Sequence, residues 1–271
     1  MAKIVVRDVC KRFAAGSRHG TEIEALDHVS LEIADQEIVC LVGPSGCGKS
    51  TLLNMLAGFD APTHGEVRVG DVEVRGAGPD RIVVFQTPAL FPWMTVRDNI
   101  AFGPRKRGVA VRQCLDDAAR YMLAMGLDGF AGHYPYQLSG GMRQRVQIAS
   151  ALVNRPEVLL MDEPFVALDF QTRLAMQELL LQIWDEFHPT IFFITHDVEE
   201  AVFLADRLYV MTRRPGRIRE EIAVPFPKPR TFGIVTTPTF VSIKERVLHL
   251  IREELTTASG RGSLNHPGGS P

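Results

Sequence analysis

The sequence predicts an α/β protein, and three observations support that class. Apolar runs of strand length, such as Ile38–Val42 and Val158–Met161, are followed by residues at helical spacing. Alternating valines on either side of Gly70-Asp71 are typical of an antiparallel hairpin. Between about residues 88 and 155 the chain changes to a helical pattern. We therefore expect an α/β core with an antiparallel β subdomain and an inserted helical subdomain.

The N-terminal part is expected to contribute strands to the antiparallel region. Ile4-Val5-Val6 is a short apolar run, and Val29, Leu31 and Ile33 alternate with polar residues as a half-buried strand does. The polar segment between them, up to about Gly20, is expected to be a loop.

A glycine-rich stretch follows the buried strand Ile38–Val42 and precedes the helical pattern that begins near Leu52. Strand, glycine loop, Gly-Lys-Ser and helix are the phosphate-binding P-loop in its confirming context, which a chance glycine-rich turn does not reproduce. Backbone N–H groups and the positive end of the helix bind a polyphosphate, Lys49 adds a charge for the β- and γ-phosphates, and the Ser50 hydroxyl can bind Mg²⁺. The predicted nucleotide-binding residues here are Gly43, Pro44, Ser45, Gly46, Cys47, Gly48, Lys49, Ser50 and Thr51.

The thiol of Cys47 is an unusual member of this loop. It lies between two glycines and near Lys49 and a helix N-terminus, which favour the thiolate. We expect alkylation of Cys47 to inactivate the protein and bound MgATP to protect it. The alternative is that Cys47 points into the core and only fills space.

The insertion is expected to begin with an irregular stretch, marked by Pro88, Pro92 and Pro104, that also carries Phe91, Trp93 and Phe102. Residues recur at helical spacing from Val111 to Met122, and Gly126 is a plausible helix stop. A second helix is expected to open at Leu138–Arg145.

Two carboxylates end the apolar strand Val158–Met161. An acidic residue such as Asp162 is often only a turn or cap residue, but after a P-loop it is the expected Mg²⁺ partner. Glu163, next to it, is then placed to orient or deprotonate a water molecule.

His196 follows another apolar strand, Ile191–Ile194. Its place at a strand end favours a sensor of the γ-phosphate over a satisfied structural histidine. Asp197 and Glu200 resemble a capping box at the start of the next helix.

The C-terminal part contains the last clear core strand, Leu208–Met211, and then five basic residues between Arg213 and Lys228, for which a solvated face is favoured over an anionic partner. Apolar residues from Phe240 to Ile251 predict an amphipathic helix. The expected division is one α/β domain over 1–235, with the helical subdomain at about 88–155, a C-terminal helix over 236–256 and a disordered tail over 257–271.

Composition excludes several classes. The net charge of −2 gives no electrostatic case for nucleic acid. The four cysteines show no metal-ligand spacing, which favours a reducing compartment. The N-terminus lacks the apolar region of a signal peptide, and no apolar run approaches the ~18 residues of a membrane helix.

Taken in order, these motifs resemble the ATP-binding subunit of an ABC transporter, over about residues 3–255. Gln86 in Val-Phe-Gln resembles the Q-loop, and Leu138–Met142 resembles the signature that separates this family from other P-loop ATPases. Asp162-Glu163 match the Walker B aspartate and catalytic glutamate, and Ala167–Asp169 match the D-loop. His196 matches the switch histidine, and Phe13 the aromatic that stacks on adenine.

The resemblance implies a P-loop ATPase fold with a RecA-like core, which uses ATP and Mg²⁺. Glu163 and His196 are then the catalytic residues, and Ser50, Gln86 and Asp162 hold the metal. Two copies close head to tail, so that each ATP lies between one P-loop and the Ser139, Gly140 and Gly141 segment of the other copy. ATP then drives a two-state closure of the dimer.

A narrower resemblance is to importers of nitrate, sulfonates or taurine, carried by the P-loop spelling, Leu90–Val96, Leu138–Arg145 and Arg214–Ile218. It implies a membrane permease, an indirect periplasmic or lipid-anchored substrate-binding protein, and a peripheral place on the cytoplasmic face of the inner membrane. The aromatic stretch after Gln86 is then a groove for the permease, with a packed loop as the alternative. Val166 departs from the small residue usual before the D-loop.

Two other functions are weighed against transport. A non-transport ABC ATPase acting on nucleic acid or ribosomes usually carries tandem cassettes, coiled-coil insertions or basic arms, which this sequence lacks. A P-loop kinase or GTPase leaves Leu138–Met142 and His196 unexplained. The substrate is not encoded here, because the permease and the binding protein select it.

Overall fold

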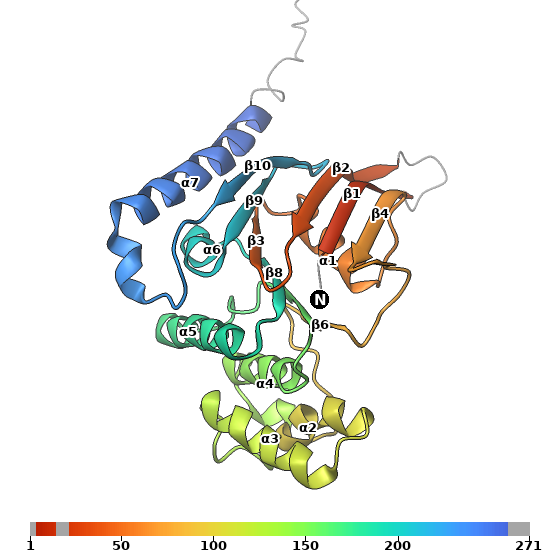
Figure 1. Ribbon diagram of the computed structural model, residues 1–271, viewed down its shortest axis with the longest axis vertical. Coiled ribbons are helices and arrows are strands. Elements are labelled where there is room, and N and C mark those ends of the chain that lie inside the picture. Colours follow the sequence, from red (N-terminus) through yellow and green to blue (C-terminus); the bar gives the residue numbers. More distant parts are fainter. Residues whose placement is uncertain (1–3, 15–21, 260–271) are drawn as a thin grey trace, which may run out of the picture.

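The computed structural model describes residues 4–14 and 22–259, which form two sheets and a lobe of helices (Figure 1). The predicted α/β class, with an antiparallel sheet and inserted helices, is confirmed. The predicted loop before Gly20 and the predicted tail from residue 260 onward lie outside the described residues.

The smaller sheet is antiparallel and has the strand order β2-β1-β4-β5. Its first strand pairs on both sides, and the predicted Gly70-Asp71 turn joins the last two strands. The strands are β1 (Ile4–Phe13), β2 (Ile23–Ile33), β4 (His64–Val69) and β5 (Val72–Glu73).

The larger sheet has the order β10-β9-β3-β8-β7-β6, and all its strands are parallel except β10. The antiparallel β10 extends the sheet beyond Leu208–Met211, the last core strand expected from the sequence. The sequence does not predict β10 because its charged residues hide the alternation of apolar and polar positions. The strands are β3 (Ile38–Val42), β6 (Arg81–Val84), β7 (Val158–Asp162), β8 (Thr190–Ile194), β9 (Arg207–Met211) and β10 (Ile218–Ala223).

Strand β3 is apolar throughout because both of its faces are buried. Val39 and Leu41 pack in a core that includes the smaller sheet and α1 (Lys49–Ala57), whereas Ile38, Cys40 and Val42 pack in the core on the opposite face. Burial on both faces is typical of a central strand in a parallel sheet. It fixes the strand that leads into the glycine loop.

The helical lobe lies at the bottom of Figure 1 and packs onto the larger core through apolar side chains. It contains α2 (Val96–Lys106), α3 (Val111–Ala124), the 3₁₀ turn η1 (Pro135–Gln137) and α4 (Gly140–Leu152). The irregular structure predicted as far as Pro104 is wrong from Val96 onward. The Thr95 side chain accepts a hydrogen bond from Asp98 N, which caps α2, and buried Ile100 anchors it despite the proline.

Four further segments complete the part of the chain that the structure describes: α5 (Phe170–Phe187), α6 (Val198–Leu204), the 3₁₀ turn η2 (Phe232–Thr236) and α7 (Pro238–Ser259). Phe240, Val247 and Leu250 are buried, so α7 packs by the face that its amphipathic pattern indicates. The helix ends at Ser259 rather than at residue 256.

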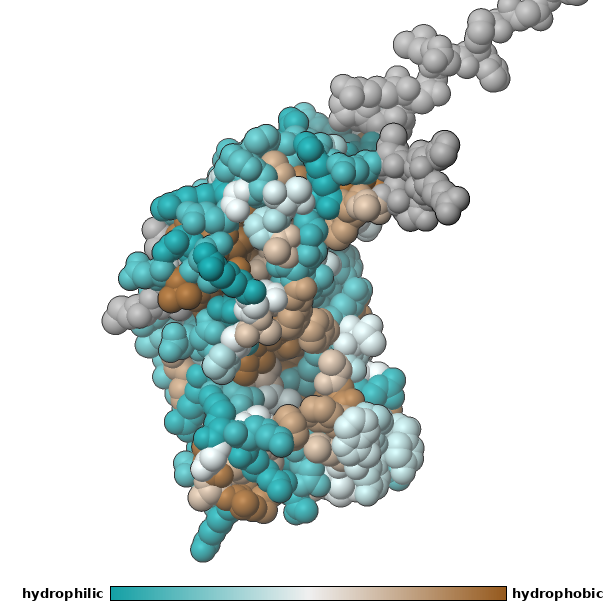
Figure 2. All heavy atoms as spheres, turned by 90° about the vertical axis from the view of Figure 1, so that its right-hand side faces the viewer, coloured by the Kyte–Doolittle hydropathy of each residue, from teal (hydrophilic) through white to brown (hydrophobic). Residues whose placement is uncertain are grey.

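Figure 2 shows a face that is mostly hydrophilic, on which apolar side chains gather around the hollow between the upper body and the helical lobe. None of the helices in residues 4–14 and 22–259 combines the length and apolar character needed to span a bilayer.

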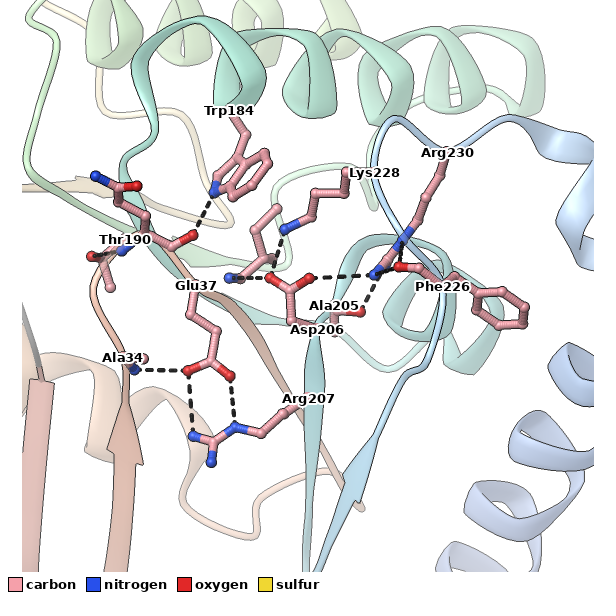
Figure 3. Close-up of polar contacts among 12 residues, drawn as sticks. Ala34, Glu37, Trp184, Thr190, Ala205, Asp206, Arg207, Phe226, Lys228 and Arg230 are labelled. Carbon is pink, nitrogen blue, oxygen red and sulfur yellow. Dashed lines mark hydrogen bonds and ion pairs between the residues drawn. The ribbon is translucent and has the colours of Figure 1, made fainter.

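The amino edge of the larger sheet is held by charged groups that bond across elements (Figure 3). Glu37, just before β3, pairs with Arg207 Nε at 2.6 Å, and the backbone N–H of Ala34 donates to its other oxygen at 2.7 Å. Asp206, just before β9, accepts from the backbone N–H of Ile38 at 2.9 Å and from Lys228 Nζ at 2.6 Å.

The segment before η2 is tied to the same edge. The Arg230 side chain is fully buried and donates to the carbonyls of Phe203, Ala205 and Phe226. Lys228 Nζ lies 3.4 Å from the centre of the Trp184 ring, a cation–π contact. These contacts connect the segment before η2 to β3, β9 and α5.

Candidate active site

The opposite, carboxyl edge of the larger sheet collects most of the predicted site residues. The glycine loop follows β3, Gln86 follows β6, Asp162 ends β7, and His196 follows β8. Because the carboxyl ends of parallel strands meet at one edge, the topology brings these residues together. Most of them line one pocket of about 530 Å³, a typical size for a small-molecule site. Its predicted members are Ser45, Gly46, Gly48, Lys49, Ser50, Thr51, Gln86, Glu163 and His196.

The loop needs glycine where it turns into α1. Gly48 has φ +112°, and a Cβ there would lie 2.6 Å from Leu26 Cδ2 and 3.0 Å from the Ala25 carbonyl oxygen. The buried Lys49 begins the helix, and its Nζ donates to the carbonyls of Gly43 at 2.9 Å and Pro44 at 3.1 Å. Main-chain N–H groups, a helix N-terminus and an ammonium group therefore converge, an arrangement that binds anions.

Three predicted loop residues lie behind the pocket rather than in its lining. Gly43 is packed so closely that a Cβ would lie 3.0 Å from Met211 Cβ, and Pro44 is also buried. Cys47 is only 1% exposed and packs in the core beside α1. These three buried residues pack the glycine loop against the core.

The expected thiolate character of Cys47 is wrong. Burial raises the pKa of its thiol, and the charge of Lys49, whose Nζ lies 3.9 Å from Sγ, offsets burial only in part. Glycine neighbours leave a side chain unshielded only if it points outward, and this one points inward. The space-filling alternative therefore holds, and we now expect slow alkylation.

Oxygen donors gather beside Lys49. The Ser50 hydroxyl hydrogen-bonds the half-buried Asp162 carboxylate. Burial, followed by the charge of Glu163, raises the pKa of Asp162, whereas Ser50 and Lys49 act in the opposite direction. A hydroxyl, a carboxylate and the nearby Gln86 amide are the hard oxygen ligands that Mg²⁺ prefers, so the residues present fit that ion.

Glu163 is the meeting point of three strand ends. Its backbone N–H donates to the Ile194 carbonyl at 2.9 Å, which holds the residue at φ +46°. Its Oε2 lies 3.0 Å from His196 Nδ1 and accepts from Gln86 Nε2 at 3.3 Å. A carboxylate oriented by two polar side chains in a phosphate-type pocket can accept a proton from a water molecule.

The helix after His196 is capped, but not by a reciprocal capping box. Asp197 Oδ1 accepts from the backbone N–H groups of Glu199 and Glu200, as expected. The Glu200 side chain instead accepts from Gln177 Nε2 at 2.9 Å, and Thr195 Oγ1 accepts the Asp197 N–H. Glu200 is buried, so it bonds the neighbouring helix rather than the cap.

Four predicted residues lie away from this pocket. Ser139 caps α4, with Oγ accepting from Met142 N at 3.3 Å, and Gly140 and Gly141 form the first turn. A Cβ at Gly141 would lie 3.3 Å from Leu168 Cδ2, so this turn is beside the Ala167–Asp169 loop. Phe13 is 41% exposed at the end of β1, with Lys11 Nζ 5.0 Å from its ring centre.

Two residues that sequence reasoning did not assign to the site line the pocket, Val166 and Arg214. Arg214 belongs to the five basic residues interpreted as a solvated face. The available signal was its position in the loop after the apolar strand Leu208–Met211, because a strand that runs parallel to β3 ends at the same edge of the sheet.

The aromatic stretch after Gln86 borders a separate groove of about 540 Å³. Phe91 packs against Phe102, with ring centres 4.5 Å apart, whereas Trp93 is 69% exposed. Met94, Thr95 and Tyr134 complete this side of the groove. The stretch is therefore packed at its base and open at its rim.

Comparison with known proteins agrees with this geometry. The family described as ABC transporter matches residues 26–166. The chain is 47% identical to the nitrate import ATP-binding protein NrtD of Synechocystis, over 85% of this chain and 89% of that protein. It is 48% identical to the taurine import ATP-binding protein TauB of Chromobacterium violaceum, over 83% and 88%. A dimeric post-hydrolysis structure of an ATP-binding cassette with ADP and Pi covers 83% of the chain and is itself covered completely, at 31% identity and a TM-score of 0.74.

Proposed function

This chain belongs to the ABC transporter family, and we propose that it is the ATP-hydrolysing subunit that energises an importer of a small anion. The observation that carries the proposal is the carboxyl edge itself, where the P-loop, Glu163 and His196 line one pocket and Asp162 bonds Ser50 beside it. Relatives named for nitrate and taurine import support the direction of transport and the class of substrate.

Within the pocket, the glycine loop and Lys49 bind the phosphates of ATP. Ser50, Asp162 and Gln86 would hold Mg²⁺, which when bound offsets the negative charge of the phosphates. Glu163 accepts a proton from the attacking water, and His196 orients that carboxylate through its 3.0 Å contact. Phe13 stacks on the base.

The separate position of Ser139–Gly141 supports a second copy as partner. One chain holds a P-loop half and a signature half that do not meet, so two copies arranged head to tail complete each site. The cassette solved as a dimer supports this arrangement. ATP held between the copies closes the dimer, and hydrolysis removes the γ-phosphate that both halves contact.

Coupling to transport is assigned to the groove beside Trp93. Its exposed indole and mixed lining suit a cytoplasmic helix of an integral membrane permease. The protein would thus be peripheral on the cytoplasmic face of the membrane, with a substrate-binding protein acting indirectly on the other side. Residues 88–155 form the subdomain that contacts the permease.

The role of Glu163 is tested by Glu163→Gln, with the exposed Glu178→Gln on α5 as matched control. Loss of general-base catalysis lowers turnover roughly 10²–10⁴-fold. ATP binding and the thermal midpoint stay near those of the parent, and gel filtration with MgATP shows an accumulated dimer. Parent-like ATPase activity in Glu163→Gln contradicts the role, and absence of ATP binding by the parent chain contradicts the proposed function.

A further inference from the structure

The loop between β9 and β10 delivers an arginine to the nucleotide pocket. Strand β9 lies next to β3 in the larger sheet, on the side opposite β8, and it ends at the same edge. Arg214 follows this strand and lines the pocket together with Lys49. A Cβ at Gly46, in the glycine loop, would lie 4.0 Å from Arg214 Nη2. The guanidinium therefore lies directly beside the loop.

Main-chain contacts fix the turn that carries this arginine. The Gly216 N–H donates to the Ala25 carbonyl at 2.9 Å, and the Asp27 N–H donates to the Gly216 carbonyl at 3.0 Å. A Cβ at Gly216 would lie 2.2 Å from the Cys47 carbonyl oxygen. The turn that carries Arg214 is thus packed against the back of the glycine loop.

Ion pairing distinguishes Arg214 from three other basic residues nearby. Arg217 pairs with Asp27, Arg219 pairs with Glu253 and Glu254, and Lys228 pairs with Asp206. Arg214 is exposed and forms no ion pair with any residue in 4–14 or 22–259. The carboxylate across the pocket, Glu163, is already engaged by His196 and Gln86.

We propose that Arg214 is a further phosphate-binding residue of this site, contacting the polyphosphate of bound ATP from the side of the loop opposite His196. A guanidinium offers a planar fork of donors that matches two phosphate oxygens, which the single ammonium of Lys49 does not. The inference rests on the proposed ATP-binding function and adds a residue to it.

The test is the dissociation constant of MgATP for the full-length chain, measured by calorimetric titration at low and moderate salt. Arg214→Ala is expected to weaken ATP binding about tenfold, since hydrogen bonds to charged groups contribute about that much. Arg214→Lys is expected to recover part of the affinity. Arg213→Ala removes an adjacent exposed charge that does not line the pocket, and it is expected to bind ATP as the parent does.

The dependence of affinity on salt and on the length of the phosphate chain shows whether Arg214 contacts the phosphates. The dependence of affinity on salt should be weaker in Arg214→Ala than in the parent, and AMP should lose less affinity than ATP. If the parent and Arg213→Ala bind ATP and Arg214→Ala binds it equally well, the inference is wrong while the proposed function stands. An equal loss in Arg213→Ala shows only a general charge effect and also overturns it. A parent that does not bind ATP overturns both.

Discussion

The two edges of the six-stranded sheet carry similar charged residues in different states. At the carboxyl edge, Lys49 bonds two carbonyls and the Cys47 sulfur of its own loop, and Glu163 bonds two exposed side chains, Gln86 and His196. At the amino edge, Asp206 accepts from the backbone of Ile38 and from Lys228, and pairs with the fully buried Arg230. One edge is open to solvent, and the other is closed by contacts between elements.

The difference separates groups that bind a ligand from groups that hold the fold. When a ligand binds, its hydrogen bonds to the protein replace bonds that the same groups made without it. The groups at the carboxyl edge therefore make contacts that a ligand can replace. A buried charge, by contrast, is tolerated only when its partners are fixed, so the amino edge uses several backbone acceptors and donors. We expect substitutions at one edge to change binding and at the other to change stability.

The largest effect is expected from Asp206→Ala at the amino edge. It leaves buried Arg230 and Lys228 without their carboxylate and the Ile38 N–H without an acceptor. Removing one member of a buried pair costs about 3 kcal/mol or more. In a chain of this size that lowers the thermal midpoint by roughly 6–12 °C. Thermal unfolding measures the loss, and Asp206→Asn, which keeps an acceptor for Ile38, should lose less.

ATP affinity of Asp206→Ala, measured well below its midpoint, should equal that of the parent. A large loss of affinity without a loss of stability would contradict the division between the edges.

The next effect is expected from Lys49→Met at the carboxyl edge, which removes the ammonium but keeps the buried stem. Loss of a charged hydrogen bond to phosphate weakens ATP binding roughly tenfold to a hundredfold. The thermal midpoint without nucleotide should change much less than in Asp206→Ala, because the partners of Lys49 are neutral groups of its own loop, two carbonyls and the Cys47 sulfur. Titration with MgATP measures the affinity, and a melting curve measures the stability. An unchanged affinity would show that Lys49 does not bind the phosphates.

The smallest effect is expected from an exposed cluster on the smaller sheet, which belongs to neither edge. His28 Nδ1 lies 2.6 Å from Asp8 Oδ1, and His64 Nε2 lies 3.2 Å from Asp8 Oδ2, with Asp27 3.6 Å from His28 Nε2. The hydrogen bond with Asp8, followed by its charge, raises the pKa of His28 above 6.5. The hydrogen bond with His28 lowers the pKa of Asp8 below 3.8.

The pH dependence follows from these directions. The contribution of His28 to the free energy of unfolding is complete below pH 6.5 and is lost as the pH rises through its raised pKa. The contribution of Asp8 is lost as the pH falls through its lowered pKa. Asp8→Asn suits the φ of +50° at this position. The melting temperature of Asp8→Asn should therefore differ most from the parent between about pH 4 and 6.5 and approach it as the pH rises through the raised pKa of His28. A difference that is constant across pH would contradict this.

Residues that the sequence predicts from short stretches of chain lie together in the fold. The glycine loop, the strand-end carboxylates and His196 were each predicted from residues adjacent in the chain, and all reach the same edge. Sequence reasoning failed for Cys47, because the direction of a side chain in a turn depends on what packs beneath it. It also misjudged Val96–Lys106, where a cap and a buried face outweigh a proline.

The sequence by itself determined the α/β class, the order of the motifs and the chemistry of each one, because apolar periodicity and turn residues are local properties. Only the tertiary structure decided which distant groups meet: Glu163 with His196, Arg214 with the glycine loop, and Asp206 with Arg230. Strand order and packing set these contacts. The physical reason is that the sequence gives the type of a charged residue, whereas the packing of distant elements decides whether its side chain is buried and which group it pairs with.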